Sequence, residues 1–386
     1  MNRKLWYLVA GYGLTIAFGI ALQFLPPTIP VMRQTLNISP GQAGTLMSSL
    51  ALFGIVVSPV VGYLADRWGG RTVGLLGLAC LIAAEAWFAL STSYGSLLLA
   101  RLAMGIGSAT LSILGAQIIS ENFMGTRYLG AAMGMMNTAV PVSILISQLG
   151  FAPLAAAHGW QAPVWACLAF TCIVAVAYAG WYRDPPQHDE KPVSLFRGLR
   201  RLNLQVWVLG LVWMFWNAGA LVLMTFANDL LVGRGMSPQA AGTMASVLIV
   251  FPVVASTSMG HVLEHRQWQR WGIVVADLVF ALFVVLLGLF TQHVILLFLC
   301  ISFSLALAPA AVFALAPHLL HGRETGLGYG VLAGLLNVGV LFGPAIGGMV
   351  RDATGSYLAS FAMAGTLTCL GAVLALFLRR PAAENA

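Results

Sequence analysis

Three ionisable side chains, Glu85, Arg101 and Asp277, lie inside long apolar stretches of this sequence and are the first candidates for chemistry. A charge inside an apolar helix costs at least about 2.5–3.5 kcal/mol on insertion scales, so each needs a partner or a wet cavity. Ser93 lies midway between Glu85 and Arg101, and a helical hairpin turning there would place both at one depth. Such a charge pair could exchange a proton, or it could simply orient two helices. Asp277 has no evident partner.

The sequence lacks the motifs of common catalytic and metal sites. It has neither a GxxxxGKS/T nucleotide-binding loop nor HExxH. Its cysteines lie in apolar stretches without CxxC or Cys/His spacing, which favours a packing role. No acid, base and nucleophile cluster at one depth. We therefore expect a protein that is not an enzyme and needs neither a cofactor nor a metal.

The composition indicates that most of the chain lies in a membrane. Of 386 residues, 59% are hydrophobic and 8% are charged, against about 25% charged in soluble proteins. Each apolar run is near the roughly 20 residues that a helix needs to cross the hydrocarbon core. We expect an all-α membrane protein with twelve transmembrane helices near residues 6–30, 42–64, 72–91, 95–119, 128–153, 161–182, 204–230, 238–260, 271–290, 293–317, 326–350 and 356–378.

The basic residues predict the orientation in the membrane. The net charge is +7, but Lys and Arg are scattered beside helix ends, so we expect no nucleic-acid partner. If the N-terminus is inside, most of them fall in inner segments, and the outer loops hold Arg33, Arg234 and Arg351. The positive-inside rule then places both termini in the cytoplasm.

An internal repeat predicts two related halves. The segment SPGQAGTLMSSL at residues 39–50 matches SPQAAGTMASVL at residues 237–248. Ser39 and Ser237 are expected N-caps, each followed by a proline at a position where a helix start tolerates it. We expect one six-helix bundle over residues 1–182, a cytoplasmic linker over 183–203 and a second bundle over 204–386.

The segment GYLADRWGGR at residues 62–71 carries a family resemblance. It is similar to the signature Gly-x-Leu-x-Asp-Arg-x-Gly-Arg-Arg of the major facilitator superfamily, and with the repeat and helix count the resemblance covers nearly the whole chain. It implies two parallel six-helix repeats that alternate access to a site between them. It also implies a conformational motif, rather than a solute site, formed by Gly62, Asp66, Arg67, Gly69 and Arg71, with a degenerate copy at Gly260 and Glu264.

By the same resemblance, several helices with polar or aromatic residues face the central cavity. Amides and indoles on an apolar wall can orient a small ligand, whereas each asparagine could instead hydrogen-bond between helices. The candidate solute-binding residues are Asn137, Asn337, Trp213, Trp216 and Asn217, with Tyr12, Gln23 and Gln117 as weaker candidates.

The sequence predicts a secondary transporter in a bacterial inner membrane. Two main hypotheses concern its solute and the direction of transport. Uptake of a small organic or inorganic anion, with proton symport, is favoured by Arg101. Proton-driven export of drug-like compounds is favoured by the aromatic seventh helix. A membrane sensor or enzyme that does not transport is the remote alternative. The expected partners are a small-molecule solute and membrane lipid, and the chain is expected to work as a monomer.

Overall fold

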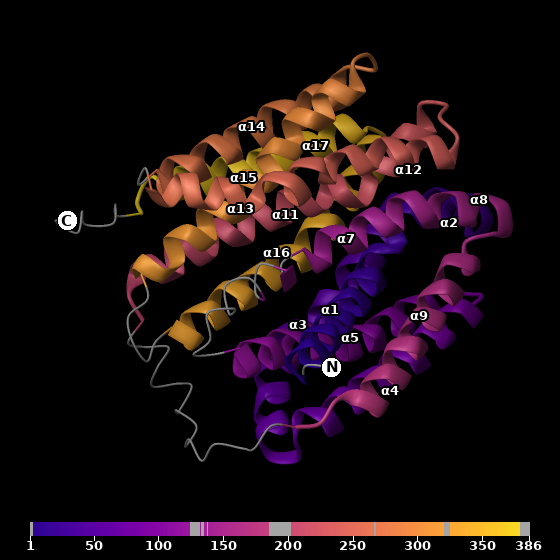
Figure 1. Cartoon of the computed structure of the whole chain (residues 1–386). Helices are drawn as coiled ribbons and strands as arrows, with labels where there is room; N and C mark the ends of the chain where they lie inside the picture. The colour runs from indigo at the N-terminus through magenta and orange to yellow at the C-terminus, as the bar shows by residue number, and fades with distance from the viewer. Residues whose placement is uncertain are drawn as a thin grey trace. The chain divides into compact units, whose positions relative to one another are not determined.

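The computed structural model describes residues 3–123, 132, 135, 136, 138–184, 202–265, 268–319 and 325–378. Over these ranges the regular structure is helical, and eleven segments are long and apolar enough to cross a membrane. The helix α3, Pro40–Trp68, lies at the position of the predicted second span. The structure confirms the all-α membrane fold expected from the sequence (Figure 1).

Contacts within the chain divide it into two compact units. Unit 1, residues Met1–Asp189 and Phe226–Ser246, contains α1 (Arg3–Gln23), α2 (Leu25–Leu36), α3, α4 (Gly70–Leu90), α5 (Tyr94–Phe123), α7 (Ala139–Ile146), η1 (Ser147–Phe151), α8 (Ala152–His158), α9 (Gln161–Trp181) and α12 (Pro238–Ser246). Unit 2, residues Glu190–Thr225 and Val247–Ala386, contains η2 (Val247–Ile249), α13 (Val250–His265), α14 (Gln269–Leu289), α15 (Val294–Leu319), α16 (Thr325–Thr354) and α17 (Tyr357–Ala375).

The helix α11, Leu204–Gly233, contributes to both units. Its first part, to Thr225, belongs to unit 2, and the part from Phe226 onward belongs to unit 1. The boundaries of the two bundles at residues 182 and 204 stay a prediction.

The predicted caps of the repeated segment are present in both copies. The Ser39 hydroxyl accepts a hydrogen bond from the backbone N–H of Gln42 at 3.1 Å, and the Gln42 side chain accepts one from the Ser39 N–H at 2.9 Å. Ser237 accepts a bond from the N–H of Ala240 at 3.2 Å. These bonds satisfy N–H groups that the first turn of a helix leaves without partners, so both helices begin where the sequence predicted.

Prolines mark interruptions in the first and eighth predicted spans, as Pro153 does beside η1 in the fifth. The first span, expected as one helix, is broken at Phe24 into α1 and α2, just before Pro26 and Pro27. The eighth span contains the short 3-10 helix η2 before Pro252. A proline within a helix removes one hydrogen bond and clashes with the preceding turn, which explains the interruptions in the first and eighth spans.

Glycines in α5 allow it to pack closely on two neighbouring helices. A Cβ atom on Gly105 would lie 2.5 Å from the Leu50 carbonyl oxygen of α3. A Cβ atom on Gly107 would lie 2.7 Å from the Leu81 nitrogen of α4. Small residues at helix interfaces let backbones approach within a membrane, where packing rather than the hydrophobic effect holds helices together.

We expect Gly107→Ala to lower the melting temperature of the purified protein, because the new methyl group would overlap the α4 backbone. Overpacking of this kind costs about 1–3 kcal/mol. Gly95→Ala, in the same helix, is the matched control, since a Cβ atom there meets nothing within 4 Å. It should be neutral or slightly stabilising, because alanine is the better helix former. Equal losses in the two variants would contradict the close packing of α4 and α5.

Candidate functional site

Arg101 is fully buried and donates to three backbone carbonyls. Its Nη1 lies 2.5 Å from the Ala21 oxygen, its Nη2 3.0 Å from the Leu22 oxygen and its Nε 3.2 Å from the Leu46 oxygen. The first two acceptors lie at the end of α1 and the third lies in α3. The guanidinium therefore ties three helices of unit 1 together.

The break between α1 and α2 explains why Arg101 is needed at this position. Pro26 has no N–H, so the Leu22 carbonyl cannot receive its usual bond from four residues later. An unpaired carbonyl buried in a membrane protein costs several kcal/mol. Arg101 supplies the missing donor, and its charge also lies 5.0 Å from the centre of the Phe24 ring.

Glu85 lies in α4 and is fully buried where α4 packs against α9. Its Oε1 accepts a hydrogen bond from the Thr171 hydroxyl at 3.2 Å, and its Oε2 has no hydrogen-bond partner among the described residues. Within that part of the chain, no ion pair of 4.0 Å or less joins Glu85 to Arg101, whose hydrogen bonds go to carbonyls. A role for the two residues in proton coupling stays a prediction.

Asp277 is the second fully buried carboxyl, in α14 of unit 2. Neither of its oxygens has a hydrogen-bond partner among the described residues. The α17 backbone comes so close at Gly371 that a Cβ atom there would lie 2.9 Å from Oδ2. The same point is 3.6 Å from the Val212 carbonyl of α11, and Cys369 of α17 lies within electrostatic range. Asp277 is thus enclosed by three helices without a compensating cation among these neighbours.

The candidate solute-binding residues of unit 1 are placed as follows. The half-buried Tyr12 hydroxyl lies 3.2 Å from the Thr138 hydroxyl, so α1 meets the segment before α7. Gln23 is buried, with an amide oxygen that has no partner among the described residues, and Gln117 is half-buried. Asn137 lies outside the described residues. Tyr12 and Thr138 are therefore the polar pair that the structure brings together.

In unit 2, both candidate asparagines donate to their own helices. Asn217 Nδ2 lies 2.7 Å from the Trp213 carbonyl, and Asn337 Nδ2 lies 3.0 Å from the Ala333 carbonyl. Trp213 meets Phe313 edge to face at 5.6 Å between ring centres, and Trp216 meets Phe280 at 5.3 Å. Asn217 and both indoles are buried, whereas Asn337 is only half-buried.

The conformational motif is held at the start of α4 by a residue that the sequence analysis assigned to the linker. Asp184 Oδ1 accepts a bond from the Arg71 N–H at 2.8 Å. Arg71 Nη2 donates to the Ala179 carbonyl at 2.6 Å, and the Tyr178 hydroxyl donates to the Gly70 carbonyl at 2.9 Å. A carboxylate at a helix N-terminus satisfies free N–H groups and complements the helix dipole.

The backbone at Gly69 depends on glycine, because its φ is +84°. That value lies in the left-handed region, which other residues rarely adopt. Arg67 is exposed. The side chains of Asp66 and Glu264, and the surroundings of Gly62 and Gly260, lie outside what the structure describes.

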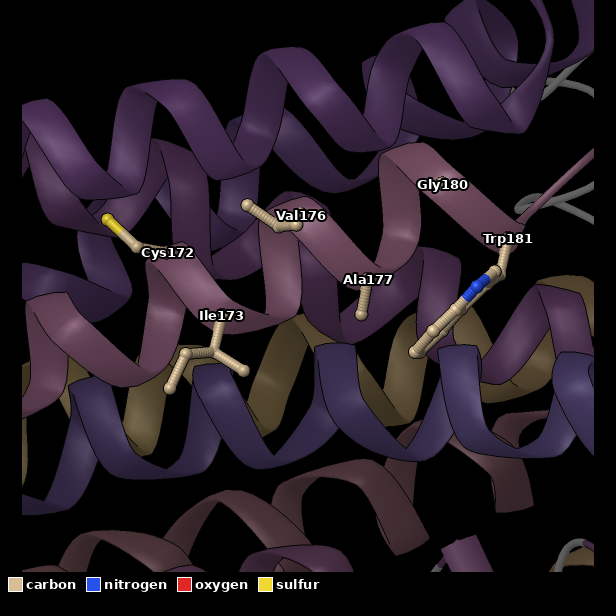
Figure 2. Close-up of a pocket in the computed structure, with 6 residues that line it drawn as sticks. All are labelled: Cys172, Ile173, Val176, Ala177, Gly180 and Trp181. Atoms are coloured by element: carbon tan, nitrogen blue, oxygen red, sulfur yellow. The ribbon is translucent and has the colours of Figure 1, made fainter.

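A shallow groove runs along one face of α9 (Figure 2). It is lined by Cys172, Ile173, Val176, Ala177, Gly180 and Trp181. Trp181 packs against Trp6 of α1, with 4.4 Å between ring centres. The lining is almost wholly apolar, whereas a solute site needs a few polar groups to orient its ligand. The groove therefore lacks the polar groups expected of a site for a polar solute.

Four residues that were not candidates from the sequence make polar contacts in the structure: Thr171, Asp184, Arg33 and Asp229. Arg33 and Asp229 form a salt bridge. Thr171 could have been found as a polar residue within an apolar run. Asp184 carries no such signal, because its partner Arg71 is 113 residues away in the chain.

Comparison with known proteins covers almost all of the chain. The family described as "Major Facilitator Superfamily" matches residues 11–232 and 208–386. A "Probable nitrate transporter NarT" of Staphylococcus epidermidis is 24% identical over 363 residues, 92% of this chain and 90% of that protein. "Multidrug resistance protein 2" of Bacillus subtilis is 22% identical over 387 residues, 96% of this chain and 94% of that protein.

Among solved structures, a bacterial homologue of the human lysosomal transporter Spinster, in an inward-facing and unoccupied conformation, superposes with a TM-score of 0.80. The two chains are 16% identical, and the match covers 98% of this chain and 96% of the other. At this identity the likeness is one of fold.

We expect Arg101→Lys to lower the melting temperature strongly, because a single ammonium nitrogen cannot reach three carbonyls that the guanidinium contacts through three separate nitrogens. Leaving a buried acceptor unpaired costs about 1–3 kcal/mol. Pro26→Ala restores an N–H that can serve Leu22, so the loss should be smaller when Arg101→Lys is made in that background. A double-mutant cycle of melting temperatures measures this coupling. Equal losses in the two backgrounds would contradict the role of Arg101 as the donor for the broken helix.

Proposed function

Because the chain belongs to the Major Facilitator Superfamily, we propose that it is a secondary active transporter that moves a small solute by alternating access, driven by a proton gradient. The family match across both halves carries this proposal. The charge pattern supports an orientation with both termini in the cytoplasm, and the proposed location is a bacterial inner membrane. A monomer is the proposed working unit.

We propose a small organic or inorganic anion as the solute class. The similarity to a probable nitrate transporter supports an anion. Arg101 adds no support, because its hydrogen bonds are made to carbonyls of its own unit. The half-buried Tyr12 and Asn337 are the proposed solute contacts, since they combine polar groups with partial exposure.

Proton-driven export of drug-like compounds is the second candidate. A row of aromatic rings in unit 2 supports it, because Phe313 packs edge to face on Trp213 and stacks on Tyr329 at 6.5 Å between ring centres. Aromatic faces bind large apolar or cationic ligands well. The similarity to a multidrug resistance protein points the same way.

Asp277 is the proposed proton carrier. A carboxyl that is fully buried and has no partner among the described residues is far cheaper to hold neutral than charged. Glu85, in contrast, has a hydroxyl donor in Thr171. The neighbours of Asp277 are Cys369 of α17, the Val212 carbonyl of α11 and the Ala276 carbonyl, which accepts a bond from Ser304 of α15.

A thermal-shift screen of the protein in detergent should identify the solute class. We expect one class of small anions to raise the melting temperature, because a ligand at 100 times its Kd stabilises the folded state by about 2.7 kcal/mol. The shift should shrink in Asn337→Ala and Tyr12→Phe. Stabilisation by cationic drugs instead would favour export, and a shift unchanged in both variants would contradict the proposed solute contacts.

Proteoliposomes test the proton carrier, empty at the start for solute accumulation and loaded with the stabilising solute for exchange. We expect Asp277→Asn to lose accumulation driven by a pH gradient while keeping solute exchange without a gradient, because exchange does not require a net proton movement. Cys369→Ala, which removes the neighbouring thiol, is the matched control and should keep both. Gradient-driven accumulation at the native rate in Asp277→Asn would contradict the assignment.

A further inference from the structure

Two consecutive residues near the end of α11 contact other parts of unit 1 through polar groups. Asp229 forms a salt bridge with Arg33 of α2. Asn228 Nδ2 donates to Gln148 Oε1 of η1 at 2.9 Å. All four residues belong to unit 1. Together they form what we call the outer clasp: Arg33, Gln148, Asn228 and Asp229.

The outer clasp is largely dry. Gln148 is 2% exposed, Asn228 1% and Asp229 6%, while the Arg33 side chain keeps partial contact with the surface. A polar group that loses its partner in such a place pays its full desolvation cost. Removing one member should therefore release the end of α11 more effectively than removing a surface charge.

The local backbone is shaped to make these contacts. The segment η1, Ser147–Phe151, is a π-helical turn, and such turns are frequent at functional sites. The α12 backbone comes so close to this turn that a Cβ atom on Gly242 would lie 2.4 Å from the Gln148 carbonyl oxygen. The turn thus presents its side chain to α11 and its carbonyl to α12.

The members of the outer clasp come from both sequence repeats. Arg33 and Gln148 precede the linker, whereas Asn228 and Asp229 follow it. In a carrier whose repeats rock against each other, contacts that join the repeats at one end must break when that end opens. Polar contacts suit this task, because the separated groups regain hydrogen bonds to water, whereas exposing separated apolar surfaces to water costs free energy.

We propose that the outer clasp closes the solute path on the outer side and opens once in every transport cycle. This inference rests on the proposed function and on the orientation predicted by the charge pattern. It assigns a role to Arg33, which lies in a predicted outer loop, and to three residues that carry no motif. The helix α11 is continuous from the outer clasp to its earlier part, up to Thr225, which belongs to unit 2.

A thiol probe at residue 147 measures opening without any solute. Ser147 is fully buried, so Ser147→Cys in a background without the five native cysteines should react slowly with a membrane-impermeant maleimide added outside. We expect Arg33→Asp and Asp229→Arg each to speed labelling about tenfold, the factor that corresponds to 1.4 kcal/mol. The double variant reverses the pair and should return the rate to near its starting value.

Arg351→Asp is the matched control, because it makes the same charge change in a predicted outer loop of unit 2. It should leave the labelling rate of Ser147→Cys unchanged. Faster labelling in the single reversals without recovery in the double variant would overturn the pairing. Unchanged labelling in the single reversals would overturn the clasp itself. This readout holds even if no solute is transported, so it separates failure of the clasp from failure of the proposed function.

Cross-linking tests whether the clasp opens during transport. A short bifunctional thiol-reactive cross-linker should join the two cysteines of the double variant Gln148→Cys/Asn228→Cys and stop solute exchange in proteoliposomes. The same double variant without the cross-linker should keep exchanging solute. The single variant Gln148→Cys, treated with the same reagent, controls for modification alone. Exchange at the untreated rate after complete cross-linking would overturn the proposal that the clasp opens in every cycle.

Discussion

The lack of water in a membrane interior is the constraint on which this structure depends. Every backbone donor and acceptor there must be paired within the protein. Where prolines break the first span, Arg101 pairs with the carbonyls at the end of α1. Where Pro252 follows a 3-10 turn, the Ser302 hydroxyl accepts a bond from the Phe251 N–H at 3.1 Å. The side chains of Arg101 and Ser302 therefore form hydrogen bonds with backbone groups at breaks in the helices, rather than being held ready for a solute.

The positions of the helices could be predicted from the sequence, because the features that determine them are close together in the chain. Apolar runs between charges predicted the helices, and Ser39 and Ser237 predicted two helix starts. The breaks at Phe24 and in η2 were missed, although prolines marked both, because long apolar runs were read as continuous spans. Proline in a membrane span is tolerated only when another group takes over the lost bond, and that group is distant in sequence.

The candidate site was less predictable, because its contacts join residues that are far apart in the chain. Glu85 and Arg101 are both buried in unit 1, but the carbonyl partners of Arg101 cannot be read from side-chain types. Asp184 looked like part of a charged linker. The repeat also gives no sign of a difference between the halves. Glu85 accepts a hydrogen bond from the Thr171 hydroxyl, whereas Asp277 lies against the α17 backbone at Gly371. The buried carboxyl of the first half therefore has a hydrogen-bond donor, whereas the one in the second half has none among the described residues.

The division of α11 between the two units has a consequence for how the protein is made. A ribosome delivers the chain from its N-terminus, so the first six helices enter the membrane before α11 exists. Asn228 and Asp229 then supply the last polar partners of Gln148 and Arg33. Until they arrive, the buried amide of Gln148 must find water, lipid headgroups or a chaperone. Assembly of the first unit is therefore completed only by a segment synthesised after the linker.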